Sequence, residues 1–404
     1  MNTTTNLSIW FGQASELKVD TPDRSQILQR MICPKILLAG LMVVLTCFGR
    51  ATEQLKIGVV AALTGPLAES GLYRIQGAKL AVEEINKAGG LLGRQIELVI
   101  EDDQTTNPGV VLAFSKLAGD KDIPGFIGPT LSTQIHAIAP DIQRLGKPVM
   151  IGGSDPRLTH MGNPWLFRCR PNDIYSARVI ADYGVNTLGK RKWAIVHSTD
   201  AFGANGMKNL VEVLKRAGVE PVLIQGYTNN SQDFTPVTLA VKQSGADVMS
   251  TYMTLPTDQG IFARQLPQLG VNIAWVGSPT TVATTTLKLA GPALYGSYGV
   301  ADFAADSSPA AKEFATKYEA TYKSAPDFNG AWTYDAVHVL AFAIENAKSI
   351  DSQQIREAIL SVKIYQGAEG IYNFDQNGDG LHGYNIVKND DGKIVFIKHI
   401  DFNE

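Results

Sequence analysis

The chain has 404 residues, of which 45% are hydrophobic and 19% are charged, and its formal net charge is -3. This length and composition are typical of a globular protein with room for two domains. Because the sequence has no basic excess and no extended stretch rich in Lys and Arg, it lacks the charge pattern of nucleic-acid-binding proteins, and we expect no nucleic-acid partner.

The first fifty residues differ from the rest of the chain. Met31 is followed by Lys35 and by an apolar run over residues 36–48, which ends near the small residue Ala51. This is the layout of a secretory signal peptide, and the run is shorter than the roughly 20 apolar residues of a membrane-spanning helix. We therefore expect residues 1–51 to be an N-terminal extension with a cleavable signal peptide, translation to begin at Met31, and the mature protein to be periplasmic.

From residue 55 onward, short β-branched segments alternate with segments of helical periodicity. Strands are expected at 55–63, 95–101, 125–128, 148–151, 165–170, 193–197, 222–227, 247–252, 273–276 and 296–300. Helices are expected at 75–87, 108–117, 132–145, 177–187, 206–217, 236–244 and 260–269. The alternation indicates an α/β fold of βαβ units with parallel sheets, and the strands are too many for one sheet of ordinary size.

After Ser308 the pattern changes to three helical segments, 309–323, 331–348 and 353–362, followed by β-rich sequence from Gly370. No Pro-rich or Ser-rich linker separates the parts of the chain. If the chain forms two lobes, it must therefore cross between them more than once.

Signatures of catalysis are missing from the sequence, which has no HExxH, GxSxG, GxxxxGK[ST] or paired CxxC motif. An Asp-x-Asn-x-Asp-Gly run at residues 375–380 matches half of a calcium loop, but position twelve is Ile386 instead of the bidentate Glu. We interpret this run as a turn between 371–374 and 384–387. No catalytic residue, metal or cofactor is expected, and the protein is predicted not to be an enzyme.

Small hydroxyl and glycine residues follow several expected strands. They are Thr64-Gly65-Pro66, Ser132-Thr133 and Gly152-Gly153-Ser154. Each has an ordinary structural interpretation, since Ser132 is a possible helix cap and the glycines a tight turn. Their repetition at strand ends, where parallel sheets form clefts, favours a site whose hydroxyl and amide groups hold a carboxylate.

The sequence resembles the leucine/isoleucine/valine-binding family of periplasmic solute receptors over residues 55–400. The matching segments are Ile57–Pro66, Gly77-Ala78, Ile85-Asn86, Gly89-Gly90, Gly93, Glu101-Asp102-Asp103, Phe126-Ile127-Gly128, Pro148–Ser154, Ala194-Ile195-Val196, Phe202-Gly203, Tyr334-Asp335-Ala336 and Phe374-Asp375. The resemblance implies a type I periplasmic binding protein, with two Rossmann-like lobes joined by a three-crossing hinge.

By matching positions, the N-terminal lobe comprises residues 52–172 plus 303–381, and the C-terminal lobe 173–302 plus 382–404. The resemblance further implies that the lobes close around a small solute. The closed form is then expected to dock on the permease subunits of an ABC transporter in the inner membrane.

The resemblance also implies the binding residues. Ser132 and the Gly152, Gly153 and Ser154 turn match the positions that grip the ligand carboxylate, and Phe202 matches an aromatic of the second lobe. The acidic position that pairs the ligand ammonium falls in residues 277–280, which contain Thr280 but no carboxylate.

An aromatic position near the cleft mouth is occupied by Ser70. Tyr73, Tyr252 and Asp258 are candidates to compensate, although Tyr252 is equally consistent with a core position. Because a buried ammonium without a countercharge costs several kcal/mol, the ligand is left open between a branched-chain amino acid and an aromatic or aliphatic acid.

An amide or urea-type solute and a sensory receptor also remain open. From these positions Ser154→Ala is expected to weaken binding by about 1 to 3 kcal/mol.

Overall fold

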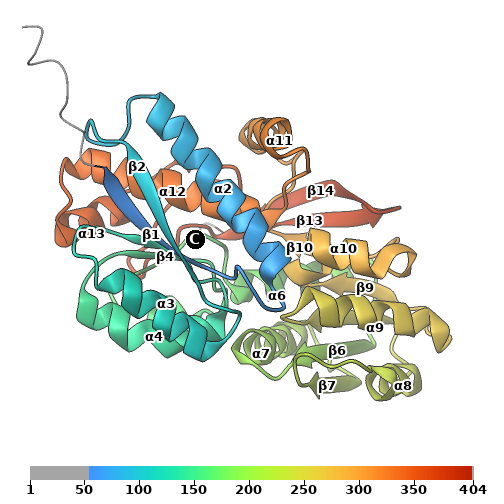
Figure 1. The fold of residues 1–404 in the computed structure, drawn as a ribbon. Coiled ribbons are helices and arrows are strands. Elements are labelled where there is room, and N and C mark those ends of the chain that lie inside the picture. Colours follow the sequence, from blue (N-terminus) through green and yellow to red (C-terminus); the bar gives the residue numbers. More distant parts are fainter. Residues whose placement is uncertain (1–53, 403–404) are drawn as a thin grey trace, which may run out of the picture. The chain divides into compact units, whose positions relative to one another are not determined.

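The computed structural model describes residues 54–402, which form two α/β lobes, each built on its own sheet (Figure 1). The first sheet has the order β2-β1-β3-β4-β5, and every neighbouring pair is parallel. Its strands are β1 (Leu55–Ala61), β2 (Ile96–Asp102), β3 (Phe126–Ile127), β4 (Val149–Ile151) and β5 (Leu166–Arg168).

Helices cover both faces of this sheet, as the alternation of side chains along β1 requires. Ile57 and Val59 point to one core, under α2 (Ala68–Lys87), α12 (Phe328–Ala347) and α13 (Ser352–Leu360), while Val60 points to the opposite core. That second core is covered by α3 (Asn107–Ala118) and α4 (Ser132–Leu145) (Figure 1). The remaining elements of this lobe are α5 (Arg157–His160), α11 (Pro309–Tyr322), β11 (Tyr365–Gln366) and β12 (Ile371–Tyr372).

The second sheet has the order β14-β13-β10-β9-β8-β6-β7. Its strands are β6 (Trp193–Ser198), β7 (Leu223–Tyr227), β8 (Val248–Tyr252), β9 (Ala274–Gly277), β10 (Tyr298–Ala301), β13 (Gly383–Asp390) and β14 (Lys393–Asp401). The strands up to β10 pair in parallel, and β13 and β14 add an antiparallel edge. β6 and β8 are buried along their whole length because helices cover both faces of the sheet.

The helices of the second lobe divide between the two faces of its sheet. One core packs under α6 (Asp173–Asp182), the π-helix η1 (Tyr183–Thr187) and α7 (Ala201–Arg216). The other packs under α8 (Thr235–Gln243), α9 (Pro256–Gln268), α10 (Thr284–Ala290) and η3 (Gly291–Leu294), with η2 (Pro279–Val282) following β9.

The chain passes between the lobes three times, after β5, after β10 and after β12. The predicted α/β fold class with two lobes and a three-crossing hinge is therefore confirmed. The predicted turn at residues 375–380 is present, with Asp375 Oδ1 accepting from the amides of Asn377 and Asp379. It is not a hairpin turn, however, because β12 and β13 belong to different sheets and the turn forms part of the third crossing.

Four helices begin at least four residues earlier than their periodicity predicted. α2 begins at Ala68, α6 at Asp173, α7 at Ala201 and α9 at Pro256, whereas the apolar pattern placed these starts at residues 75, 177, 206 and 260. The physical reason is that these first turns extend beyond the sheet cores, so their residues do not carry the apolar spacing that identifies a helix.

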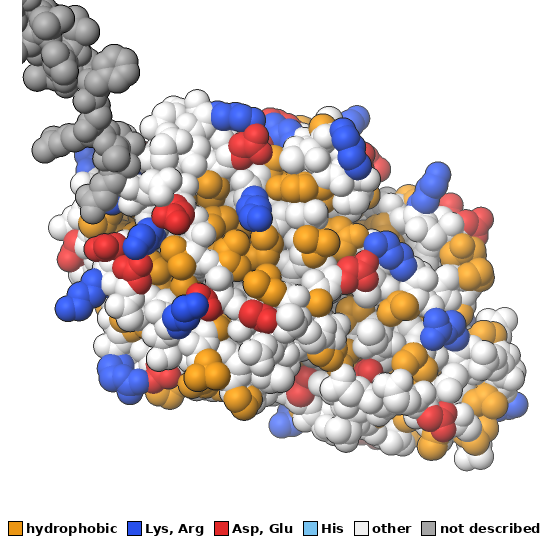
Figure 2. All heavy atoms as spheres, viewed as in Figure 1, with side chains coloured by type: hydrophobic (Ala, Val, Ile, Leu, Met, Phe, Trp, Pro, Cys, Tyr) orange, Lys and Arg blue, Asp and Glu red, His pale blue; other side chains and the backbone are white. Residues whose placement is uncertain are grey.

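The surface fits the charge pattern of the sequence. Lys and Arg side chains are interspersed with Asp and Glu on the face shown in Figure 2, without a basic patch.

Among residues 54–402, no helix combines the length and apolarity needed to cross a bilayer. The expected signal peptide at residues 1–51 lies outside the described residues.

Buried ion pairs connect the crossings. Arg168 Nε donates to Asp379 Oδ1 at 2.7 Å, and both side chains are almost completely buried, so the first crossing is tied to the third. Arg170 Nε donates to a carboxylate oxygen of Asp302, which ties the first crossing to the second. Asn172 adds a hydrogen bond to Asp379 Oδ2 at 3.1 Å.

Beside these pairs lies a carboxyl group that has no ion-pair partner within residues 54–402. Asp173, the first residue of α6, is fully buried and accepts hydrogen bonds from the hydroxyls of Ser154 at 2.9 Å and Ser176 at 3.3 Å. Burial raises the pKa of Asp173 to about 7, and the Ser154 hydrogen bond and the charges of Arg168 and Arg170 only partly oppose this rise.

We predict that Asp379→Asn lowers the free energy of unfolding by about 3 to 5 kcal/mol, because the buried charge of Arg168 loses its partner. Urea-induced unfolding followed by circular dichroism measures this change. The control is Arg216→Ala, which removes the exposed Arg216–Glu212 pair and should cost less than about 1 kcal/mol. An equally small loss for both variants would contradict the role given to the buried pair.

Asp173→Asn should change how stability depends on pH. Because the folded protein protonates Asp173 near pH 7 and the unfolded chain near 3.8, the stability that this group confers falls as pH rises between these values. The free energy of unfolding of the wild type relative to Asp173→Asn should therefore fall by roughly 2 to 3 kcal/mol between pH 5 and pH 8. A difference in the free energy of unfolding between the wild type and Asp173→Asn that stays constant over this pH range would refute the prediction.

Candidate functional site

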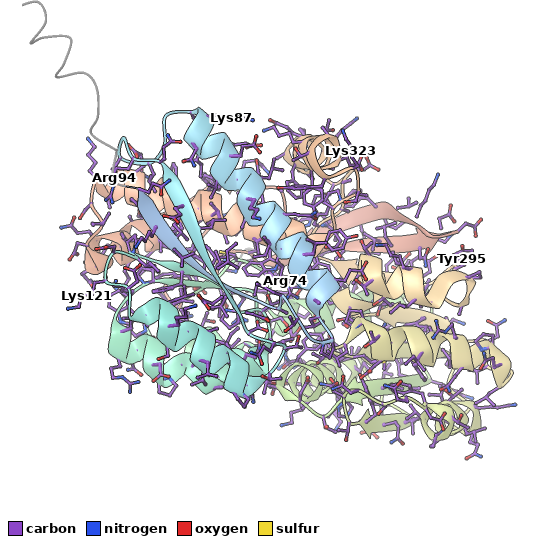
Figure 3. The ribbon with its side chains drawn as sticks, viewed as in Figure 1. Arg74, Lys87, Arg94, Lys121, Tyr295 and Lys323 are labelled. Atoms are coloured by element: carbon purple, nitrogen blue, oxygen red, sulfur yellow. The ribbon has the colours of Figure 1, made fainter. Side chains whose placement is uncertain are left out.

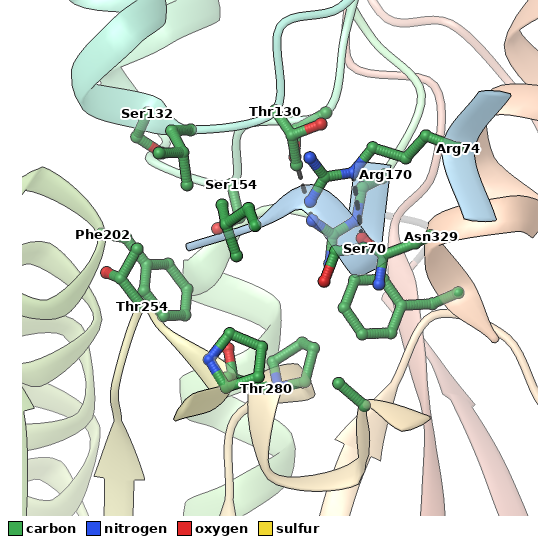
Figure 4. A pocket seen from close by; sticks show the side chains of 17 residues that line it. Ser70, Arg74, Thr130, Ser132, Ser154, Arg170, Phe202, Thr254, Thr280 and Asn329 are labelled. Carbon is green, nitrogen blue, oxygen red and sulfur yellow. Dashed lines mark hydrogen bonds between the residues drawn. The ribbon is translucent and has the colours of Figure 1, made fainter. Parts of the chain in front are cut away.

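A pocket with a volume of about 60 Å³ lies between the two lobes (Figure 4). The first lobe contributes Leu67, Ser70, Arg74, Thr130, Leu131, Ser132, Gly152, Ser154, Phe328 and Asn329 to its lining. The second lobe contributes Phe202, Thr254, Pro256, Pro279, Thr280 and Ala283, and Arg170 comes from the first crossing. This volume corresponds to a few water-sized spheres, so the pocket suits a small molecule rather than a polymer.

The structure brings together six of the eight binding residues named from the sequence. Those on the pocket lining are Ser70, Ser132, Gly152, Ser154, Phe202 and Thr280. They come from α2, α4, the loop after β4, α7 and η2, which are far apart in the chain. The strand-end rule explains why they meet, because parallel strands of both sheets direct their following loops to one cleft.

Gly153 and Tyr252 do not line the pocket. A Cβ atom on Gly153 would lie 2.5 Å from Ile135 Cδ1 and 2.7 Å from Leu158 Cδ1, so this glycine allows the loop to pack against α4. Tyr252 is fully buried at the end of β8, with its ring centroid 5.8 Å from that of Phe202. It supports Phe202 from the core, and its hydroxyl lies 2.9 Å from Ser176 Oγ.

Ser132 begins α4, as the sequence predicted. The helix cap, Leu131, makes no side-chain hydrogen bond to the first turn, so the amides there have no capping acceptor. Ser132 Oγ accepts from the Asp155 amide at 3.3 Å and keeps its own hydrogen available for another acceptor. A hydroxyl donor and the positive end of a helix dipole thus face the pocket together.

Ser154 and Gly152 are more committed to protein partners than the sequence suggested. The Ser154 hydroxyl donates to Asp173, so while Asp173 is ionised that hydrogen is not available to a ligand. The Gly152 amide donates to the Pro129 carbonyl at 3.1 Å, and the Gly152 carbonyl accepts from Arg170 Nη1 at 3.0 Å. Gly152 and Ser154 therefore shape the pocket floor, whereas the hydroxyl hydrogen of Ser132 is the one more available to a ligand.

Two arginines on the lining, Arg74 and Arg170, were missed by the sequence interpretation (Figure 4). Arg74 lies one helical turn after Ser70 on α2, so the i, i+4 spacing from a named site residue was an available signal. Its Nε donates to Asn329 Oδ1 at 3.0 Å, and burial lowers its pKa to about 10. Arg170 lies with its guanidinium carbon 4.6 Å from the centroid of the Phe328 ring.

Asp258 and Tyr73, which the sequence offered as replacements for the acidic residue absent from positions 277–280, bond to other protein groups outside the pocket. Asp258 is buried on α9, accepts from the Asn230 amide at 2.9 Å and does not line the pocket. The Tyr73 hydroxyl accepts from Lys288 at 3.3 Å, outside the pocket.

Contacts between the lobes lie on more than one side of the pocket. Lys288 of the second lobe pairs with Glu69 of the first at 2.7 Å. The Asn205 side chain donates to Asp155 Oδ2 at 3.0 Å. Because these bonds join α10 to α2 and α7 to the loop after β4, the structure shows the lobes in contact around the pocket.

Comparisons with known proteins agree with this architecture. The chain is 29% identical to "Leu/Ile/Val-binding protein homolog 3" of Brucella melitensis, covering 85% of this chain and 94% of that protein. The branched-chain amino acid transporter substrate-binding protein LivJ of Streptococcus pneumoniae, solved with isoleucine, has a TM-score of 0.80 at 24% identity, covering 87% of this chain and 100% of that one. A solute-binding protein of R. palustris, solved with benzoate, has a TM-score of 0.78 at 19% identity, covering 87% and 98%.

The sequence profile described as "Periplasmic binding protein" matches residues 54–393, which is most of the chain. This family consists of solute-binding proteins rather than enzymes, and its members work outside the cytoplasm. With the two-lobed fold and the pocket between the lobes, the match shows that the chain belongs to the periplasmic binding protein family.

Proposed function

We propose that this protein is the extracytoplasmic solute-binding component of an ABC importer and that it takes a small solute bearing a carboxylate. The observation that carries the proposal is the division of polarity across the pocket. The first lobe presents Ser132, the start of α4 and Arg74, all of which are hydrogen-bond donors. The second lobe presents Phe202 and other uncharged side chains, which suit an apolar body.

The solutes of two structural neighbours support this class. Isoleucine and benzoate, the ligands in the Streptococcus pneumoniae and R. palustris structures, share a carboxylate and an apolar body and differ in the ammonium group. A branched-chain amino acid and an aromatic or aliphatic acid are therefore both within the proposal. Micromolar affinity corresponds to about -8 kcal/mol, which a few charge-assisted hydrogen bonds and one buried apolar group supply.

Binding is proposed to couple to hinge bending between two lobes, 52–172 plus 303–381 and 173–302 plus 382–404. The first and last few of these residues lie outside the described part of the chain. A solute that contacts both lobes stabilises the closed form selectively, which is the thermodynamic condition for closure. The bonds of Lys288 with Glu69 and of Asn205 with Asp155 form only when the lobes meet.

The proposed cellular role follows from the family. The signal peptide at residues 1–51 would export the chain to the periplasm, and the closed protein would deliver its solute unchanged to permease subunits in the inner membrane. Binding without turnover fits the pocket lining, which contains no His, Cys or carboxylate side chain to act as nucleophile or general base.

A ligand screen tests the proposal. The purified protein is challenged with branched-chain amino acids, short aliphatic acids, benzoate and the corresponding amides, and its melting temperature and radius of gyration are measured. We expect at least one carboxylate to raise the melting temperature and to reduce the radius of gyration, because ligand binding stabilises the folded closed state. Stabilisation by amides alone, or chemical conversion of a bound compound, would refute the proposal.

Ser132→Ala should weaken binding of the best carboxylate by about 1 to 3 kcal/mol, because it removes a hydrogen bond to a charged group. Isothermal titration calorimetry measures the change. The matched control is Ser308→Ala, since Ser308 caps α11 away from the pocket and its loss should leave affinity unchanged. Equal affinities for Ser132→Ala and the wild type would remove Ser132 from the site.

A further inference from the structure

The charges on the pocket lining are all of one sign. Among its seventeen residues, Arg74 and Arg170 are the charged side chains, and none is Asp or Glu. The two guanidinium groups lie close together at one end of the pocket, and Phe202 lies across from them (Figure 4). The pocket therefore has a cationic end and an uncharged end.

The charge of Arg170 is balanced by the protein. Its Nε donates to the buried carboxylate of Asp302, and Nη1 donates to the Gly152 carbonyl at 3.0 Å. The Phe328 ring covers its guanidinium at 4.6 Å from the centroid. The proximity of Asp302 raises the pKa of Arg170 against the effect of burial, so this arginine is a structural cation of the hinge.

The charge of Arg74 is not balanced in this way. Its side chain is 6% exposed, yet within residues 54–402 its guanidinium makes no ion pair and its one hydrogen bond goes to the neutral Asn329 amide oxygen. Burial is the main reason that its pKa falls to about 10, and the nearby positive charge of Arg170 adds to this fall. Both terminal nitrogens lack a protein acceptor in the described structure.

The carboxylates that act on Arg74 from a distance are occupied. Asp327 caps α12 through the Asn329 amide at 2.9 Å and also accepts from the Thr284 amide at 3.2 Å. Asp103 accepts from the Thr105 amide at 2.7 Å. Neither forms an ion pair with Arg74 in the described structure, so an anion entering the pocket would be the first negatively charged group to contact this guanidinium directly.

The opposite wall has no carboxylate to pair with an ammonium group. The second lobe contributes one aromatic ring, two prolines, an alanine and two threonines to the lining. Asp258, the buried acid on α9, is bonded to the Asn230 amide and lies off the lining. An amino acid bound here would bury its ammonium beside a guanidinium and without a carboxylate of the protein to pair with it, which is strongly unfavourable.

Resting on the proposed function, we infer that the solute is a small carboxylic acid without an amino group, whose carboxylate pairs with the Arg74 guanidinium. The start of α4 and Ser132 lie on the same lobe and supply further neutral donors to the pocket lining. The apolar body of the acid faces Phe202, Pro279 and Ala283 of the second lobe. Arg74 is then the residue that determines the charge class of the solute.

Matched pairs of compounds test the inference on the wild-type protein. Isothermal titration calorimetry compares 4-methylpentanoate with leucine, 3-methylbutanoate with valine, and 3-phenylpropanoate with phenylalanine, and 4-methylpentanamide serves as the uncharged analogue. We expect the best-binding acid to bind at least about 10-fold more tightly than its amino acid and than its amide, because only the acid pairs with Arg74 without burying a second charge.

Variants separate Arg74 from the rest of the site. Arg74→Gln should weaken acid binding by about 10-fold or more and change amide binding by less than about 3-fold. Lys87→Gln, at the far end of the same helix (Figure 3), should alter neither affinity. Thr280→Asp, which places a carboxylate on the second-lobe wall, should shift the acid-to-amino-acid preference towards the amino acid.

The outcomes distinguish the inference from the proposed function. If leucine, valine or phenylalanine binds as tightly as its deaminated partner, the inference is wrong while carboxylate binding stands. If the amide alone binds, or if no compound of the panel binds, both are contradicted. Should Arg74→Gln fail to fold, the wild-type preference and the response of Thr280→Asp still decide the question.

Discussion

The hinge depends on buried Arg–Asp pairs at alternate positions of the first crossing. Arg168 pairs with Asp379 of the third crossing, and Arg170 pairs with Asp302 at the start of the second. Both arginines also donate to carbonyl groups of the loop at residues 152–155. A buried charge is tolerated only while its partner is present, so both arginines are held in place by their carboxylates. Because the same arginines bond to the loop at residues 152–155, the interactions that join the crossings also fix the floor of the pocket.

The two lobes contribute different chemistry to the pocket. The first supplies donors and the one unbalanced cation, Arg74, whereas the second supplies Phe202 and a neutral wall. A ligand that satisfies the cation but does not reach the second lobe would bind without favouring closure. Under the proposed function, selectivity for charge comes from one lobe, and the energy that holds the lobes together comes from contact of the ligand with both.

Much of the fold could be predicted from the sequence because central parallel strands are buried on both faces and are therefore unbroken apolar runs. The lining of the candidate site was predicted in part. Ser132 and Ser154 follow strands and were expected at the cleft, whereas Arg74 was not, because a single arginine on a helix is ordinarily solvated. The first turns of α2 and α7 were missed for a related reason, since they face the cleft and carry no core spacing. Tyr252 was placed at the site by its position in sequence, and burial puts it behind Phe202.

The peptide of Gly152 touches the pocket on one side and receives a hydrogen bond from the hinge residue Arg170 on the other. A Cβ atom at this position would lie 2.8 Å from the Trp332 ring, so no other residue fits without displacing that ring. The pocket floor at Gly152 and the hinge residue Arg170 are therefore coupled, and a substitution at Gly152 would disturb both. The ligand specificity of this protein can therefore change most readily through the opposite wall of the pocket, around Pro279 and Thr280. A side chain can be exchanged there without disturbing the contact between Gly152 and Arg170.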